Sequence, residues 1–294
     1  MKENVKTSKP QHAQRHVVLI NKLRWYLRWP CKWMIFAIVY MVVCFPYPSL
    51  LIRHFRHLSN PNALIEPDAP ALQPWVAELR EALPADLDPS EVLEHVEGFV
   101  IRHVPYQWDW ITWGVVDYLP TVTEVIEKGQ EDCDGRAVVA ASLLRALGYN
   151  AWLVTDFAHM WVATDYGETM GPGRIKTVEV TEEGVRFQWA GLFELPRATA
   201  YGVAVFPPER ELILVAAAWL LLLGGAGYAR SATSLLLLVG GLFMIRYGGS
   251  DYWDPLLWTQ VSAELAGLAA MIAAFVVMFI RLRSSTGGGS GRLV

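Results

Sequence analysis

Long hydrophobic stretches lie near both ends of the chain, and a long polar segment separates them. Residues 33–52 carry no charge, and residues 212–229 form a second uncharged run. A transmembrane helix needs about 20 predominantly apolar residues to cross the hydrocarbon layer of a bilayer. The pattern therefore predicts four transmembrane helices, over residues 33–52, 212–229, 231–249 and 261–280.

The distribution of charge predicts the orientation of these helices. Residues 1–32 form a basic arm with a net charge of +7, whereas residues 53–211 have a net charge of −13. Because basic segments flanking a span stay in the cytoplasm, we expect the arm and the linker-like tail 281–294 inside the cell. The loop 250–260 and the acidic middle are then outside. The predicted location is the cell (inner) membrane, with the main soluble domain in the periplasm.

The composition excludes some classes of protein. Charged residues make up 18% of the chain and hydrophobic residues 53%, whereas soluble domains carry about 25% charged residues. The chain is therefore not an ordinary soluble enzyme. Its acidic middle repels phosphate groups, which excludes nucleic acid as a partner. The expected partners are the lipid bilayer and either a protein or peptide substrate or other subunits of a membrane complex.

Residues 53–70 are predicted to form a linker, and residues 71–207 a soluble domain. Helix signals are strong in the first half of this domain. Asp88 and Glu91 have the spacing of a capping box, and so do Thr121 and Glu124. Gly148 is the expected residue after the end of a helix that begins near Cys133. Predicted helices cover residues 71–83, 88–100, 121–129 and 133–147.

After Gly148 the hydrophobic period changes from helical to alternating. Runs rich in Val, Ile, Thr and Trp predict strands over residues 151–156, 160–164, 175–180 and 185–189. Turn residues separate these runs. Helices followed by strands favour an α+β domain with an antiparallel sheet.

Two residues of this domain carry candidate chemistry. Cys133 is the only cysteine of residues 71–207, and it lies where a helix begins, a position that favours the thiolate. His159 opens the strand pattern His159–Val162 and could receive the thiol proton. Asp132 and Asp134 oppose the thiolate, so an active Cys133 needs a cationic partner. Trp108, Trp110 and Trp113 either line a substrate cleft or pack the domain and touch lipid headgroups.

Residues 100–164 carry several motifs in a fixed order. They are V-x-Y, G-x-x-x-C-x-x-x-A, a helix ending in LLRALG, and H-x-W-V, here Val104–Tyr106, Gly129–Ala137, Leu143–Gly148 and His159–Val162. These motifs resemble the core of the transglutaminase-like superfamily and cover about a quarter of the chain. The resemblance implies a papain-like fold and a Cys–His–Asp triad that acts on amide or thioester carbonyls. Cys133 matches the nucleophile and His159 the general base.

The third member of the implied triad is missing from its usual position. Gly171 stands where the family has an acid before Pro172. Glu179 is the first candidate, because a long hairpin loop would bring it beside His159. Asp156 is another candidate. Asp165 would lie roughly 20 Å from His159 along the same strand at about 3.3 Å per residue.

These observations lead to one fold prediction and two functional hypotheses. The predicted fold is an α+β protein with a papain/transglutaminase-like core, its helices packed on an antiparallel sheet, attached to about four transmembrane helices. The first hypothesis is a membrane-anchored cysteine acyltransferase, amidase or peptidase that uses Cys133, His159 and Glu179 on extracytoplasmic protein or peptide. The second is a catalytically inactive module that serves as a binding or structural subunit. No cofactor and no metal site is predicted.

Overall fold

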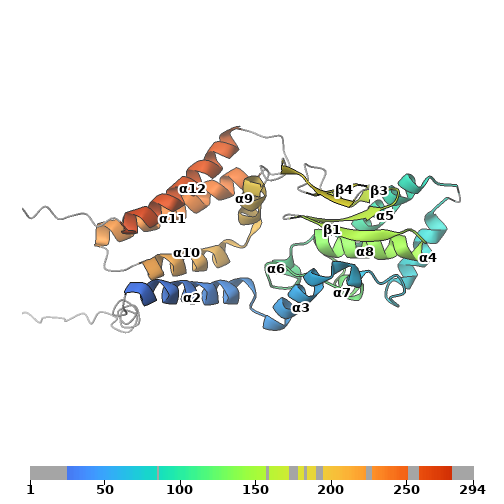
Figure 1. The fold of residues 1–294 in the computed structure, drawn as a ribbon, viewed down its shortest axis with the longest axis horizontal. Coiled ribbons are helices and arrows are strands. Elements are labelled where there is room, and N and C mark those ends of the chain that lie inside the picture. Colours follow the sequence, from blue (N-terminus) through green and yellow to red (C-terminus); the bar gives the residue numbers. More distant parts are fainter. Residues whose placement is uncertain are drawn as a thin grey trace, which may run out of the picture.

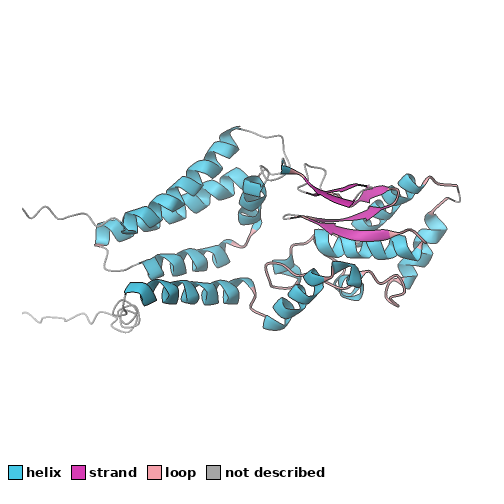
Figure 2. Cartoon of the chain, viewed as in Figure 1, coloured by secondary structure: helices cyan, strands magenta, loops and turns pink. Residues whose placement is uncertain are grey.

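The computed structural model describes residues 25–84, 86–156, 159–171, 178–181, 184–189, 195–222, 227–250 and 258–279. Its elements divide between two parts that lie at opposite ends of an elongated molecule (Figure 1). One part contains only helices, and the other contains helices packed against β-strands (Figure 2). The second part holds all three predicted site residues, Cys133, His159 and Glu179.

The helical part combines segments from both ends of the chain. α2 (Trp25–Cys44) packs beside α10 (Pro208–Leu222), and α11 (Tyr228–Gly249) packs along α12 (Trp258–Phe279) (Figure 1). α9 (Leu195–Val205) packs against α11 and α12. Many large side chains of these helices are exposed and apolar, which suits a lipid environment rather than water.

Two of these helices, α11 and α12, are long and apolar enough to cross a membrane. α10 has 15 residues, which span about 22 Å at 1.5 Å per residue and fall short of the ~30 Å hydrocarbon layer. α2 meets the criterion only together with the helix that follows it. The prediction of four transmembrane helices is therefore wrong. The described residues contain two candidate spans, or three if α2 and the next helix form one broken span.

The predicted span 33–52 is interrupted near its end. α2 ends at Cys44, and a new helix, α3 (Pro48–Ser59), begins after Phe45–Tyr47 at an angle of 89° to it. Pro46 and Pro48 explain the break, because proline lacks an N–H and disfavours helical conformation in the residue before it. The stretch is apolar as predicted, but its two prolines divide it between two helices.

The four helices predicted in the mixed part lie close to their predicted positions, whereas two short helical segments there were not predicted. α5 (Pro89–His103) has the Asp88–Glu91 capping box, and α7 (Val122–Lys128) has the Thr121–Glu124 box. α8 (Cys133–Ala146) begins at the predicted residue. The remaining helical segments are η1 (Pro61–Leu64), α4 (Gln73–Ala82) and α6 (Asp109–Thr112).

The strands form two separate antiparallel sheets. β1 (Ala151–Thr155) pairs with β2 (Met160–Thr164), and β2 pairs with β3 (Gly167–Thr169) through a tight turn at Asp165–Tyr166. β4 (Val178–Thr181) and β5 (Gly184–Phe187) pair with each other. The described residues of β4 and β5 do not extend the first sheet.

The fold-class prediction is contradicted by this arrangement. Helix dominates the described residues, and the sheet against which α8 packs has only three short strands. A papain-like core needs a larger sheet. Predicted strands 151–156 and 160–164 agree with β1 and β2, but β3 was not predicted, and residues 175–177 of a third predicted strand lie outside the described residues. Strand pairing depends on contacts between distant segments, which period and turn signals do not specify. The mixed part is therefore a small helical domain with a three-stranded sheet.

α8 is the central element of the mixed part. It packs against β1 and β2 and against α4, α5 and α7. Every residue from Ala137 to Leu144 is buried, so this helix has no water-facing side over two turns. An all-round apolar helix is a core element. Its rigid surroundings fix the position of its first residue, Cys133.

Candidate functional site

The loop before α8 sets the position of Cys133. α7 ends at Gly129, whose φ of +65° is a left-handed conformation that suits glycine. Glu131 then forms a bridge with Tyr106, because its N–H donates to the Pro105 carbonyl at 3.1 Å. The Val-Pro-Tyr segment thus anchors the loop from which α8 starts.

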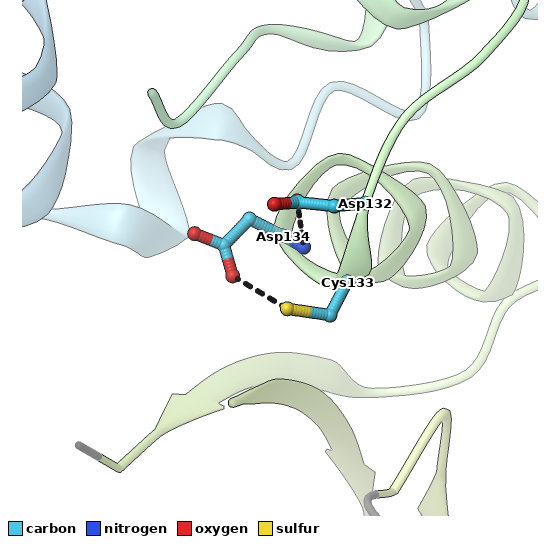
Figure 3. A group of neighbouring side chains, drawn as sticks. All are labelled: Asp132, Cys133 and Asp134. Carbon is cyan, nitrogen blue, oxygen red and sulfur yellow. Dashed lines mark hydrogen bonds between the residues drawn. The ribbon is translucent and has the colours of Figure 1, made fainter. Parts of the chain in front are cut away.

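The first turn of α8 orients the thiol. The Asp132 carboxylate caps the helix by accepting from the Asp134 backbone N–H at 3.1 Å. The Cys133 thiol donates to Asp134 Oδ1 at 3.4 Å (Figure 3). The backbone N–H of Met160 also hydrogen-bonds the sulfur. Cys133 is therefore held between the start of α8 and the start of β2, directly beside the residue that follows His159.

The environment of Cys133 favours the neutral thiol. Burial raises its pKa well above the ordinary value, and the carboxylates of Asp134 and Asp132 raise it further. The Met160 N–H lowers the pKa, but by less. The resting side chain is a thiol that donates to Asp134, so attack by sulfur requires a base that removes this proton.

His159 lies in a turn that joins β1 to β2. Its backbone N–H donates to Asp156 Oδ1 at 3.0 Å, and its carbonyl accepts from the Asp156 N–H at 3.0 Å. Its ring Nε2 lies 2.9 Å from the Met170 carbonyl oxygen. The ring is also nearly parallel to the indole of Trp161. A backbone carbonyl thus occupies a position that an orienting acid could have taken.

A residue that the sequence did not single out holds this carbonyl in place. Glu97 of α5 accepts from the Met170 backbone N–H at 3.0 Å and from the Thr169 hydroxyl at 2.7 Å. Met170 has a φ of +59°, which is rare for a residue with a side chain. Glu97 stabilises this conformation and so directs the carbonyl towards His159. Glu97 differs from the other acidic residues of α5 only through these tertiary hydrogen bonds. No sequence signal identifies it.

The three candidate acids occupy different places. Glu179 lies in β4 opposite Arg186, in the separate hairpin, while β3 takes the place beside β2 that the prediction required for the Glu179 strand. The Asp165 carboxylate accepts from the Asn150 side chain at 3.3 Å in the β2–β3 turn. Asp156 contacts the His159 backbone. The assignment of Glu179 as the orienting acid stays a prediction.

A cluster of carboxylic acids lies behind the thiol. Oxygens of Asp109, Glu131 and Asp132 lie within 4.8 Å of one another, and so do the ligand atoms of Asp132, Cys133 and Asp134. Glu131 accepts from the Trp113 indole N–H at 2.5 Å, and Asp109 accepts from a backbone N–H. These groups are the kind that bind hard cations, but they also share hydrogen bonds among themselves.

Burial and mutual repulsion keep much of this cluster protonated. Burial raises the pKa of Glu131 to about 7, even though hydrogen bonds from Trp113 and Asp132 lower it. Burial and Asp117 raise the pKa of Asp134 to about 7. The pKa of Asp109 is raised well above its ordinary value by burial and by Asp132. Several protons are therefore bound beside Cys133 near neutral pH.

The tryptophans near the site serve mainly in packing. Trp108 stacks on Trp110, and these rings contact Tyr201 and Phe206. They connect the mixed part to α9 and to the segment that follows it. Trp113 packs against a tyrosine ring and donates to buried Glu131.

Comparison with known proteins does not assign this chain to a family. Neither a protein-family model nor a curated protein matches the sequence. Within the part of the chain that the structure describes, there are two or three candidate membrane helices and a small domain that contains a thiol, an imidazole and a buried acidic cluster. The resemblance to the transglutaminase-like superfamily stays a prediction based on motifs.

Proposed function

We propose that this chain is a membrane-anchored thiol acyltransferase or amidase that acts on extracytoplasmic protein or peptide carbonyls. The observation that carries the proposal is the position of Cys133 at the N-terminus of α8, hydrogen-bonded by the N–H of the residue after His159. A thiol at a helix start paired with an imidazole base is typical of enzymes that form thioester intermediates, and the proposal pairs Cys133 with His159 in this way. The motif spacing between the two residues agrees with this chemistry.

The proposed reaction begins with attack of the Cys133 sulfur on an amide carbonyl. His159 takes the thiol proton as the S–C bond forms, and it returns that proton to the departing amine when the C–N bond breaks. The resulting thioester is then transferred to an amine or to water. The backbone N–H of Cys133 stabilises the oxyanion in both steps. The Met170 carbonyl helps to hold the imidazole orientation through Nε2.

Alkylation kinetics of Cys133 test this proposal. The full chain in nanodiscs, with Cys31 and Cys44 replaced by Ser, is treated with iodoacetamide across a pH series. If His159 assists proton removal, His159→Ala slows alkylation by about tenfold for each unit by which the thiol pKa rises. Equal rates in the two proteins would contradict the role of His159.

A second variant tests whether the charge of Asp134 affects the pKa of the Cys133 thiol. Asp134→Asn removes a carboxylate that raises the pKa of Cys133, so it should speed alkylation above about pH 7, where the Asp134 carboxyl is ionised. If Asp134→Asn has this effect while His159→Ala has none, the thiol is accessible and the imidazole is not its base.

The second candidate function is an inactive binding or structural module. The raised pKa of Cys133 and the contact of His159 Nε2 with a backbone carbonyl favour it. This module would retain its partner binding in a Cys133→Ala variant. Loss of acyl transfer with unchanged partner binding in that variant would instead support the enzyme.

A further inference from the structure

α3 presents two chemically different faces. On the inner face Arg53 forms an ion pair with Glu124 at 2.8 Å, and His57 Nδ1 lies 2.6 Å from the Leu119 carbonyl oxygen. His54 is buried and lies 3.9 Å from the Asp117 carboxylate. These contacts attach α3 to the segment that leads into α7, so α3 cannot continue into the hydrocarbon layer as a free extension of α2.

The outer face of α3 is apolar and uncovered. Ile52 and Phe55 are each 61% exposed, although they lie three residues apart and so share one side of the helix. Leu58 and Tyr47 extend this apolar surface, and exposed Arg56 borders it. Large adjacent apolar side chains with basic neighbours are typical of helices that lie in a membrane interface.

The angle between α2 and α3 also indicates that α3 lies at the membrane surface, and this argument does not use the apolar face of α3. α2 exposes Trp33, Ile38 and Val42 along its length, as expected for a helix in contact with lipid. Although α2 passes the composition test only together with α3, its 20 residues span about 30 Å, and a helix bent by 89° from a span of that length lies close to the membrane plane. Only three residues separate the two helices, so α3 must lie close to the depth at which α2 leaves the hydrocarbon.

We propose that α3 lies in the headgroup region of the bilayer, with Ile52 and Phe55 inserted towards the acyl chains. Insertion of roughly 5–10 Å is usual for such helices. Exposed Arg56, which borders this apolar surface, then lies at the level of the lipid phosphates. The inner-face contacts tether the Asp117–Glu124 segment, and with it the start of α7, to the membrane surface. This inference does not depend on the proposed enzymatic function.

Photo-crosslinking of the full chain in nanodiscs tests the proposal. Benzoylphenylalanine replaces Phe55 in one protein and Tyr166 in another, and the nanodiscs contain phosphatidylcholine and phosphatidylglycerol. Tyr166 is a matched control, because it is 57% exposed but lies in the β2–β3 turn. We expect a phospholipid adduct by mass spectrometry at position 55 and none at position 166.

Other outcomes overturn the proposal. Equal lipid labelling at both positions, or none at position 55, would show that the outer face of α3 does not contact the bilayer. A protein adduct at position 55 would identify another polypeptide as the occupant.

A depth measurement separates an interfacial helix from a transmembrane one. Trifluoromethylphenylalanine at position 55 gives a fluorine signal that spin-labelled lipids broaden. A nitroxide near the headgroup should broaden this signal more than one at the end of the acyl chain. The reverse order would place α3 in the bilayer centre and refute the inference.

Discussion

Replacing Glu131 with Gln tests how the acidic cluster affects stability. Glu131 is completely buried, and its carboxyl accepts hydrogen bonds from the Trp113 indole and the Asp132 backbone N–H. Because its pKa is raised from 4.5 to about 7, the folded protein binds a proton here that the unfolded chain has released. The stabilisation is fully present below pH 4.5 and is lost as pH rises through about 7.

The magnitude follows from the two pKa values. Raising a pKa from 4.5 to about 7 corresponds to roughly 3 kcal/mol of pH-dependent stability. This value is an upper limit, because Asp109 and Asp132 compete for the same protons. Gln carries no titrating proton, so Glu131→Gln should flatten the decline in stability between pH 4.5 and 7. Its amide also fails to accept one of the two hydrogen bonds, which should lower stability by about 1 kcal/mol at acidic pH.

Urea unfolding of the full chain in a fixed detergent, followed by tryptophan fluorescence across this pH range, measures the difference in slope. Glu124→Gln is the matched control, because the sign of its effect is opposite. Burial raises the Glu124 pKa, but hydrogen bonds from Thr121 and the charge of Arg53 lower it by more. The ionised Glu124 carboxylate therefore stabilises the folded protein above pH 4.5, and this contribution is lost as pH falls. If the free energy of unfolding changes with pH in the same way for the wild type and for Glu131→Gln, the reasoning is refuted.

Two further predictions compare glycines that differ only in their surroundings. A Cβ at Gly241 would lie 2.7 Å from the Gly267 carbonyl oxygen, whereas one at Gly240 meets nothing within 4 Å. Gly241→Ala should therefore lower the thermal midpoint through separation of α11 and α12, and Gly240→Ala should not; equal midpoints in a thermal scan would show that this packing is unimportant. A Cβ at Gly135 would overlap the Glu131 side chain and lie 2.9 Å from a valine methyl, whereas one at Gly202 meets nothing within 4 Å. Gly135→Ala should cost about 1–3 kcal/mol in urea unfolding, and an effect no larger than that of Gly202→Ala would contradict the packing at the start of α8.

Local elements could be predicted because their signals lie within a few residues. The capping boxes at Asp88 and Thr121, the start of α8 at Cys133 and the strand Met160–Thr164 all agree with the structure. Each depends on short-range hydrogen bonds or on the period of side chains along one element. Hydropathy likewise located the apolar helices at both ends of the chain.

The surroundings of the candidate site could not be predicted in the same way. The acceptor for His159 is a backbone carbonyl, and Glu97, which fixes it, lies more than 60 residues earlier in the chain. The raised pKa values of Glu131 and Asp134 arise from burial, which a list of acidic residues does not reveal. Tertiary structure alone decides these features.

The sequence by itself located four helices and two strands of the mixed part, the apolar segments at both ends of the chain, and the residues that carry a thiol and an imidazole. Only the tertiary structure decided that β3, rather than the strand of Glu179, pairs with β2, and that α3 turns by 89° to leave α2. The physical reason is that local propensity acts over one or two turns of chain, whereas strand pairing and burial depend on which distant segments meet.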